Sequence, residues 1–469
     1  MVRRVPLLVL LLGFVQAAAA PQPGSISLLI TNGTVVAMDA ADRVLPDGAV
    51  AIDGRDIVAV GEASALARQY RAAETIDAHG GVIMPGLINT HTHAPMVLFR
   101  GLADDLALME WLQKYIFPAE AKTVSPAFVR AGTRLAALEM IESGTTTYAD
   151  MYYFEEEIAR ATREAGLRGV LGQTIIRFPV PDAKTPAEGL ARAERFARSF
   201  AGDELITPAV APHAVYTLDE ATLKAARALA DRLHIPLIIH IAETQDEVKT
   251  IDAARHQTPV AYLDTLGFWG PRTLAAHAVW VTDEDIRILA ARHVGVSHNP
   301  ESNMKLASGT APVPAMRRAG IAVGLGTDGA ASNNDLDMFE AMRQAAFLHK
   351  LTTGDPRAIP APAAIAMATI DGARALGMER EIGSLEPGKR ADVIVVSMDA
   401  ARQTPVYDVR SHLVYVTRGD DVRTTVVNGR VLMKDRRVLT LDRSAVLEEA
   451  RAWAARVRAA VAPEGAVRQ

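Results

Sequence analysis

Gly86-Leu87-Ile88-Asn89-Thr90-His91-Thr92-His93 directly follows the apolar run of residues 81–85. An apolar run bounded by glycine and proline predicts a buried strand. Alternate residues of a strand point to the same side, so the imidazoles of His91 and His93 can be directed at one point. Imidazole nitrogen is a common protein ligand for zinc and related metals. A pair of polar histidines that only ends a strand is the alternative interpretation, and the rest of the chain decides between the two.

The chain beyond Pro85 alternates apolar strands with helical segments. Eight strands are predicted, and they end at His91 or His93, Asp150, Ile176, His213, His240, His277, His298 and Asp328. Eight strands that alternate with helices predict a (β/α)8 TIM barrel, in which the carboxyl ends of the strands carry the chemistry. Because seven of the eight strand ends are His or Asp, we favour a functional role for them over chance placement.

Short alternating strands occupy both ends of the chain. They run from Ser25 to about Ile83 and return beyond Gly377, with one strand predicted at residues 414–416. Asp-Gly at residues 53–54 and Asn-Gly at residues 428–429 are hairpin signals. We expect the two segments to pair in one small, discontinuous β-sandwich beside the barrel.

Helix-start signals accompany the barrel strands. The sequence Thr217-Leu218-Asp219-Glu220 predicts a capping box that opens a helix to about Leu233, and Thr282-Asp283-Glu284-Asp285 predicts another. A helix rich in Glu, Arg and Ala is predicted from about Ser444 to Val461. The predicted divisions are a signal peptide at 1–20, sandwich segments at 21–85 and 378–440, the barrel at 86–377, and a helix and tail at 441–469.

The overall composition is that of an ordinary globular protein. The 469 residues are 49% hydrophobic and 22% charged, which is enough apolar material for a large core. The net charge is −5 and basic residues form no run, so nucleic acid is not expected as a partner. The chain has no cysteine, which excludes disulfides and thiolate ligands and leaves His, Asp and Glu to bind any metal.

The first twenty residues have the order of a secretory signal. Arg3 and Arg4 precede an apolar run that ends at Val15, and small residues follow at 17–20. The run is too short to span a membrane. We expect cleavage at or before Ala19 and export, in a bacterium to the periplasm. A cytoplasmic protein with an uncleaved apolar N-terminus is the alternative.

Four of the strand-end residues could form one metal site. His91, His93 and His240 offer nitrogens and Asp328 offers an oxygen, which leaves a position for water as in catalytic metal sites. A metal lowers the pKa of such a water toward neutrality. The fourth strand ends in His213, not in a lysine that could bridge two metals as a carbamate. We therefore expect one divalent metal ion.

Two further residues could move protons at this site. Glu243 lies three residues beyond His240 and could carry a proton between the water and a substrate nitrogen. The alternative for Glu243 is an acid placed in the first turn of a helix, where acids are favoured. His277 ends the next strand and could orient or polarise the water.

These motifs resemble the amidohydrolase superfamily, and within it the mononuclear aromatic deaminases. The matching strings are residues 86–93, His240-Ile-Ala-Glu243, His277 and residues 326–329. Longer strings resemble the 5′-methylthioadenosine/S-adenosylhomocysteine deaminases, and they are residues 111–120, 298–308 and 327–338. The resemblance covers essentially residues 25–432. It implies His91, His93, His240 and Asp328 as metal ligands; we expect zinc, although such His and Asp donors also accept iron or manganese.

The resemblance also implies roles around the metal. Glu243 would carry the proton to the ring nitrogen next to the attacked carbon, while His277 and Asp328 would assist the water and accept its proton. The products would be ammonia and the hypoxanthine form of 5′-methylthioadenosine, S-adenosylhomocysteine or adenosine. We also expect a homo-oligomer that binds neither nucleic acid nor, once the signal is removed, a membrane.

Four residues would bind the purine nucleoside in this comparison. Glu120 would hold the two ribose hydroxyls, a task that suits a carboxylate, and His213 would reach the ribose or a purine nitrogen. Trp111 would pack on the 5′ thioether end and Ser332 would contact the purine. As alternatives, Trp111 is a core aromatic, Ser332 is a helix cap and Glu120 is a surface acid.

Some residues fit no family motif, and other functions stay open. Arg177 could bind a polar substrate tail or pair with an acid such as Asp182, and His298 is assigned a structural role. A second enzyme class keeps the site but acts on guanine, a pterin or a chlorinated triazine. A third interpretation is an exported protein that binds purines or metal without turnover; an intact Glu243 and His277 argue against it.

Overall fold

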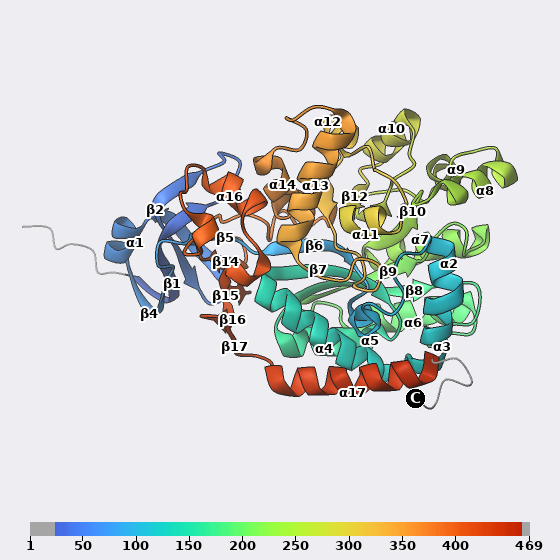
Figure 1. Cartoon of the computed structure of the whole chain (residues 1–469), viewed down its shortest axis with the longest axis horizontal. Coiled ribbons are helices and arrows are strands. Elements are labelled where there is room, and N and C mark those ends of the chain that lie inside the picture. Colours follow the sequence, from blue (N-terminus) through green and yellow to red (C-terminus); the bar gives the residue numbers. More distant parts are fainter. Residues whose placement is uncertain (1–23, 462–469) are drawn as a thin grey trace, which may run out of the picture.

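The computed structural model describes residues 24–461 and contains the predicted barrel (Figure 1). Eight parallel strands neighbour one another in chain order: β6 (Leu87–Thr92), β7 (Thr145–Tyr152), β8 (Arg168–Ile175), β9 (Ile206–Pro212), β10 (Leu237–Ile241), β11 (Thr273–His277), β12 (Gly295–His298) and β13 (Val323–Leu325). The strands are buried along nearly their whole length, because helices cover the outside of the barrel. All eight predicted strands are therefore confirmed.

The barrel closes where its last strand meets its first. The backbone N–H of Asp328, just beyond β13, donates to the carbonyl of His91 on β6 at 2.9 Å. A side chain at Gly324 would lie 2.4 Å from the methyl group of Thr90 on β6, so this approach requires glycine. Closure thus places Asp328 beside His91.

Helices between the strands form the outer layer, and several begin at side-chain caps. They are α4 (Pro126–Ser143), α5 (Glu155–Ala165), α6 (Pro186–Ser199), α7 (Glu220–Leu233), α8 (Gln245–Arg255), α9 (Pro259–Thr265), α10 (Asp283–Ala291), α11 (Pro300–Lys305), α12 (Val313–Arg318), α13 (Met338–Thr353), α14 (Ala361–Met367) and α15 (Ile370–Ala375). The predicted capping box of Thr282 and Asp285 is confirmed. The prediction at Thr217 is wrong, because Asp219 caps α7.

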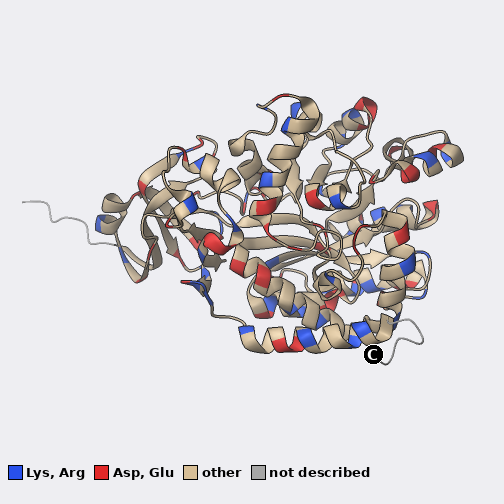
Figure 2. Cartoon of the chain, viewed as in Figure 1, with Lys and Arg blue, Asp and Glu red and all other residues tan. Residues whose placement is uncertain are grey.

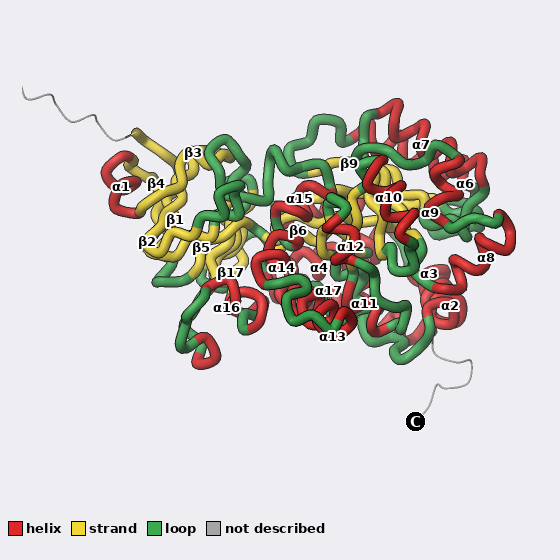
Figure 3. The backbone as a smooth tube through the Cα atoms, turned by 90° about the horizontal axis from the view of Figure 1, so that it is seen from above, coloured by secondary structure: helices red, strands yellow, loops and turns green. Residues whose placement is uncertain are grey.

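The strands at the two ends of the chain form one mixed sheet beside the barrel, seen from a second direction in Figure 3. The N-terminal strands are β1 (Gly24–Val36), β2 (Val44–Asp53), β3 (Asp56–Glu62), β4 (Tyr70–Asp77) and β5 (Val82–Pro85), with α1 (Ala63–Gln69) between β3 and β4. The C-terminal strands are β14 (Val393–Val396), β15 (Val422–Val427), β16 (Arg430–Lys434) and β17 (Arg437–Val438). Antiparallel pairing of β5 with β14 joins the two halves. The expected discontinuous β domain is confirmed.

The two predicted hairpin turns meet each other in this sheet. Gly54 lies in the β2–β3 turn and Gly429 lies in the β15–β16 turn. A side chain at Gly429, which has φ +75°, would lie 1.9 Å from the carbonyl oxygen of Gly54. Gly429 therefore serves both a left-handed turn and a close backbone contact.

One predicted strand in the C-terminal segment is wrong. Residues 414–416 fall at the end of the helix α16 (Val409–Tyr415), which Asp408 caps by accepting from two backbone N–H groups. Leu413 and Val414 are the buried residues of this helix. A short apolar run does not distinguish a strand from a buried helical turn, and here tertiary packing selects the helix.

The C-terminal helix α17 (Arg443–Val461) lies along α4, as Figure 1 shows. It buries Val446, Ala450 and Val457. Trp453 packs edge-on against Phe128 of α4, with ring centroids 5.5 Å apart. Among residues 24–461, no helix combines the length and the apolar character needed to cross a membrane. Acidic and basic residues are both distributed over the outer helices (Figure 2).

The connection between β6 and α4 forms one wall above the barrel. It contains η1 (Ala94–Phe99), α2 (Leu108–Trp111), a π-helical turn η2 (Leu112–Ile116) and α3 (Phe117–Thr123). Short 3-10 turns η3 (Ala401–Gln403) and η4 (Gly419–Asp421) lie in the C-terminal segment. A π-helical turn is rare and is often found at functional sites. Here it directs Leu112 and Ile116 into the pocket described below.

Candidate active site

The predicted site residues surround one pocket at the carboxyl ends of the barrel strands. The pocket encloses about 610 Å³, its open mouth included, which is within the range of small-molecule sites. Its lining contains His93, Trp111, Glu120, His213, His240, Glu243, His277, Asp328 and Ser332. Predicted side chains as far apart in sequence as His93 and Ser332 thus line one pocket.

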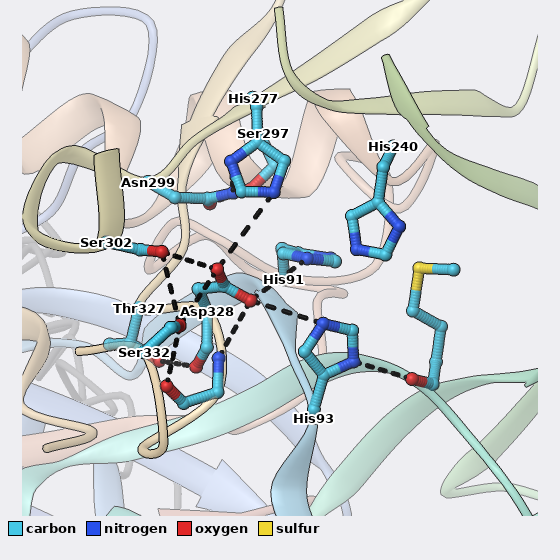
Figure 4. A network of polar contacts seen from close by, with 12 residues as sticks. His91, His93, His240, His277, Ser297, Asn299, Ser302, Thr327, Asp328 and Ser332 are labelled. Carbon is cyan, nitrogen blue, oxygen red and sulfur yellow. Dashed lines mark hydrogen bonds and ion pairs between the residues drawn. The ribbon is translucent and has the colours of Figure 1, made fainter. Parts of the chain in front are cut away.

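Three imidazoles meet at the bottom of this pocket (Figure 4). The ring of His91 lies 4.9 Å, between centroids, from the rings of both His93 and His240. The Nδ1 atom of His93 lies 2.7 Å from the carbonyl of Met151, and Nδ1 of His240 lies 2.9 Å from the carbonyl of His213. A carbonyl only accepts, so Nδ1 carries the hydrogen in both rings and Nε2 is left to face the cluster.

Asp328 completes the cluster. It follows β13, the strand that closes the barrel against β6. Its Oδ1 lies 3.4 Å from Nε2 of His91 and 3.2 Å from Nε2 of His93. The hydroxyls of Ser302 and Ser332 donate to Oδ2 at 2.6 and 3.1 Å. Burial alone would raise the pKa of Asp328, but the close approach of the two histidine rings holds it well below its usual value.

The histidines are in unequal electrostatic environments. Burial lowers the pKa of His91 to about 4 and lowers that of His240 as well. Burial also opposes protonation of His93, but the hydrogen bond to Asp328 and its charge raise the pKa of His93 to about 9. His93 and Asp328 therefore form an ion pair at neutral pH when no metal is bound.

The donor set fits a divalent metal ion. His91, His93 and His240 form one group whose ligand atoms lie within 4.8 Å of one another, and His91, His277 and Asp328 form a second. Both ring nitrogens of His91 are buried without a hydrogen-bond partner among the described residues. A buried polar atom without a partner is costly, and coordination would relieve that cost. The pocket floor is therefore a metal-binding cluster of nitrogen and oxygen donors.

Glu243 lies beside this cluster. It follows Ala242 and is the second residue after the end of β10. Its side chain is almost fully buried, and burial raises the pKa of its carboxyl group. Its Oε2 lies 3.8 Å from Nε2 of His277, and the hydroxyl of Ser308 lies 3.5 Å from Oε1. A carboxyl group with a raised pKa that faces a pocket suits proton transfer near neutral pH.

His277 ends β11 in a left-handed backbone conformation, with φ 72°. Its Nε2 faces the pocket 4.0 Å from Oδ2 of Asp328. Its Nδ1 contacts the side-chain amides of Asn303 at 2.9 Å and Asn299 at 3.3 Å. The asparagines lie in and before α11, so the string at 298–308 positions the catalytic candidate His277.

Glu120 lines the same pocket and is held by two tyrosines that the sequence did not single out. The hydroxyl of Tyr152 donates to Oε1 of Glu120 at 2.7 Å, and the hydroxyl of Tyr153 lies 3.5 Å from Oε2. Burial raises the pKa of Glu120 to about 7 although the hydrogen bond from Tyr152 opposes the shift. Glu120 is thus a buried acid in the pocket, not the surface acid of the alternative interpretation.

The other predicted binding residues have mixed placements. Trp111 is buried in the pocket wall. His213 lines the pocket, and burial lowers its pKa to about 3, so its ring is neutral. Ser332 reaches the pocket but its hydroxyl is bonded to Asp328, and Asp337, not Ser332, caps α13.

Two residues left open by the sequence lie away from the pocket lining. Arg177 is exposed, and the suggested pairing with Asp182 is wrong because the side chain of Asp182 is buried and pairs with Arg192 at 3.2 Å. His298 is buried, with Nε2 3.1 Å from Nε2 of His349 on α13. This contact fits the structural role expected for His298.

Two sets of acids behind the site were not found from the sequence. Glu247, in the first turn of α8, accepts from the backbone N–H groups of Ala242 and Glu243. Asp150 accepts from the N–H of Ala94, and Glu155 accepts from the N–H of Tyr152. All three carboxyl groups are buried, and each fixes backbone next to a pocket residue. The strand-end position of Asp150 was the only signal.

Comparisons with known proteins place this fold and site in a family. The amidohydrolase family model matches residues 82–432. The chain therefore belongs to the amidohydrolase family. It is 49% identical over 424 residues to a 5-methylthioadenosine/S-adenosylhomocysteine deaminase of Syntrophobacter fumaroxidans, covering 90% of this chain and 97% of the relative.

Other relatives carry different substrate names at similar identity. The chain is 48% identical over 426 residues to a 5′-deoxyadenosine deaminase of Methanosarcina acetivorans, covering 90% of this chain and 96% of that one. Among solved structures, a zinc-bound adenosine deaminase from Xanthomonas campestris superposes with a TM-score of 0.92 at 41% identity, covering 93% of this chain and all of that one. These relatives share deamination and differ in the group attached at the nucleoside 5′ position.

Proposed function

We propose that this chain is a metal-dependent deaminase that converts the adenine of 5′-methylthioadenosine, 5′-deoxyadenosine or a related nucleoside to hypoxanthine and releases ammonia. The observation that carries the proposal is one pocket that contains buried Glu243 beside the metal cluster and buried Glu120 on another wall. The named activities of the deaminase relatives support it.

The metal is proposed to be a single zinc ion held by His91, His93, His240 and Asp328. The zinc-bound relative supports this choice, as does the mixture of imidazole and carboxylate donors. When bound, such an ion supplies Lewis-acid chemistry and brings the pKa of a water molecule toward neutrality. His277 faces the same cluster and is assigned to orienting the attacking water.

The chain's own groups then account for the proton movements. Water adds to the amino-bearing carbon of adenine, and Asp328 with His277 takes a proton from it. Glu243 takes the other proton of the water and delivers it to the adjacent ring nitrogen, and the proton held by Asp328 and His277 then passes by way of Glu243 to the leaving amino group, so that one water is consumed and one ammonia is released. The raised pKa of Glu243 favours the protonated form of its carboxyl group, as proton delivery to the substrate requires.

Glu120 is assigned to the two ribose hydroxyls. An ionised carboxylate offers two oxygens that can each accept from one hydroxyl of the diol. The hydroxyls of Tyr152 and Tyr153 approach the same carboxylate and orient it. A ribose partner favours a nucleoside over guanine, a pterin or a triazine, none of which carries such a diol on the ring.

The test is turnover by the purified, zinc-loaded protein. We expect adenine-like ultraviolet absorbance to become hypoxanthine-like, with ammonia released, for 5′-methylthioadenosine, 5′-deoxyadenosine or adenosine. Turnover of free bases, pterins or triazines without any nucleoside would overturn the nucleoside assignment. Tight binding of a nucleoside without ammonia release would instead identify a binding protein.

We also propose that residues 1–20 direct export of the chain. This segment lies outside the described residues, and the proposal is supported by its sequence alone. Expression of the full chain in a bacterium, followed by cell fractionation and mass spectrometry of the N-terminus, tests it. We expect a periplasmic protein that begins at or before residue 20. An intact N-terminus in the cytoplasm would refute export.

A further inference from the structure

The structure bears on the 5′ substituent of the nucleoside, which the proposed deaminase function leaves open. The polar groups of the pocket are already assigned: Glu243 faces the purine and Glu120 faces the ribose. The wall between them and the mouth comes from α2 and the π-helical turn. It presents Leu108, Trp111 and Leu112, which share one helical face and are buried.

This wall continues as apolar surface on its other sides. Met96 lies on one flank and Leu306 on another, and both line the same pocket. A methyl or methylthio group placed here would pack against apolar side chains and lose its contact with water, which is favourable. The pocket thus has a matching surface for a small apolar 5′ end.

No arginine or lysine side chain is found among the described residues that line the pocket. The same holds for the two cavities that adjoin it. One shares Leu108 and Leu306 with the pocket and contains Asp246 as its charged residue. The other shares Phe117, Glu120 and Tyr153. A carboxylate on a long 5′ substituent would therefore meet neutral or acidic groups in each direction.

The basic side chains near these cavities have partners or lie outside the lining. Lys249 pairs with Asp246 at 3.8 Å, and Lys305 pairs with Asp104 at 2.6 Å. Arg177 directly precedes Phe178, which lines the second adjoining cavity, but Arg177 is not part of that lining. A buried carboxylate without a cationic partner is strongly disfavoured.

We propose that this pocket selects adenosines whose 5′ substituent is small and uncharged, such as 5′-deoxy or 5′-methylthio, and discriminates against nucleosides with an amino-acid tail, such as S-adenosylhomocysteine. The inference rests on the proposed deaminase function. It names a preference that the substrates named for the relatives do not decide.

Substrate comparison gives the first test. We expect kcat/KM for 5′-methylthioadenosine and 5′-deoxyadenosine to exceed that for S-adenosylhomocysteine by at least about tenfold. The reason is that the tail carboxylate of S-adenosylhomocysteine finds no partner in the pocket, and an unpaired polar group lowers kcat/KM strongly. Equal kcat/KM values would overturn the inference and leave the deaminase intact. Absence of turnover on every nucleoside would instead overturn the proposed function.

A gain-of-function variant gives the second test. Met109 lines the adjoining cavity that also contains Asp246. Its side chain is 38% exposed, so it can be replaced without disturbing the core. Met109→Arg should raise the ratio of S-adenosylhomocysteine to 5′-methylthioadenosine activity several-fold over the matched neutral variant Met109→Gln. An unchanged ratio would show that absence of a cation is not what sets the preference.

Arg177 supplies the opposing test. If its guanidinium reaches a substrate carboxylate, Arg177→Gln will lower activity on S-adenosylhomocysteine while leaving 5′-methylthioadenosine unaffected, and the inference fails. We expect Arg177→Gln to change the two activities by the same factor.

Discussion

Glu247 holds the backbone of Glu243: Oε2 of Glu247 accepts a hydrogen bond from the N–H of Glu243 at 3.0 Å. Its Oε1 accepts from the N–H of Ala242 at 2.9 Å. Ala242 has a left-handed backbone with φ 49°, which costs free energy unless neighbouring contacts support it. One buried carboxyl group therefore fixes the loop that directs Glu243 into the pocket.

Replacing Glu247 should lower catalysis through the position of Glu243. We expect Glu247→Ala to reduce kcat by about 10–100-fold, because small displacements of a catalytic group have effects of this size. Glu247→Gln keeps one acceptor and should be milder. KM and zinc content should change little. Asp252→Asn, an exposed change on the same helix, is the control, and a similar loss there would assign the effect to helix stability.

Glu243 itself should be required for turnover but not for metal binding. Loss of a general acid–base group typically lowers the rate by about 10²–10⁴-fold, so Glu243→Gln should remove most activity. Metal analysis and calorimetric titration with a nucleoside should show zinc and substrate still bound. Activity equal to that of the unmodified protein would refute the proton-transfer role.

The barrel was predictable because its strands are short apolar runs and seven of the eight predicted strand ends are His or Asp. The runs that end at Asp150, His240 and Asp328 are buried on both faces, and parallel strands of this kind have a strong hydrophobic signal. The catalytic candidates were predictable for the same reason, since polar residues at the ends of buried strands are conspicuous.

Contacts between distant segments were not predictable. Tyr152 and Glu120 are 32 residues apart, and in sequence a tyrosine next to a strand is indistinguishable from a core aromatic. Glu247 resembles an ordinary acid of a first helical turn, although it supports Glu243. The helix at 409–415 replaced a predicted strand because packing, not periodicity, decided its conformation.

Zinc binding should depend on pH through one proton. The pKa of His93 is raised to about 9 by Asp328, whereas those of His91 and His240 are lowered by burial. His93 is thus protonated below about pH 9 in the metal-free protein and must lose its proton when metal binds. We expect the apparent affinity to fall by about tenfold per unit as pH decreases from 8 to 6.

Chelator competition at several pH values measures this slope. A hundredfold change of apparent affinity per pH unit would show that a second histidine is also protonated. An affinity that does not change with pH would show that His93 is neutral. The loaded protein should also unfold at a higher temperature than the metal-free protein, because an ion that binds only the folded state stabilises it.

The buried pair of Asp150 and Glu155 should support His93, one of the proposed metal ligands. Burial raises the pKa of Asp150 to about 7, and burial together with the neighbouring charge of Asp150 raises the pKa of Glu155 well above its usual value. The pair therefore holds a proton near neutral pH. Asp150 also accepts from the N–H of Ala94, beside His93, and is followed in sequence by Met151, whose carbonyl orients His93.

An amide can replace the shared proton of this pair. Glu155→Gln retains a donor toward Asp150 and should keep stability and zinc affinity close to normal. Glu155→Ala leaves a buried acceptor without a partner and should cost about 1–3 kcal/mol of stability, with zinc affinity lowered by about 10–100-fold. Equal losses in both variants would show that the side-chain volume matters and the hydrogen bond does not.

Ribose recognition should weaken below neutral pH because it depends on ionised Glu120. Burial raises the pKa of Glu120 to about 7, so its carboxyl group is protonated below that pH and offers fewer acceptors to the ribose diol. We expect KM for 5′-methylthioadenosine to rise toward tenfold per unit as pH falls below 7. A 2′,3′-dideoxy analogue lacks the diol, so its KM should not rise in this way as pH falls.

Variants of Glu120 and of its tyrosine partners separate this effect from other titrations. Glu120→Ala should impair nucleosides far more than free adenine, and equal impairment would refute the ribose contact. Tyr152→Phe removes the 2.7 Å hydrogen bond that favours the ionised form, so the midpoint of the KM profile should move to higher pH. Tyr153→Phe removes a contact of 3.5 Å and should move it less. A midpoint that is the same in both variants would mean that the profile reports a group other than Glu120.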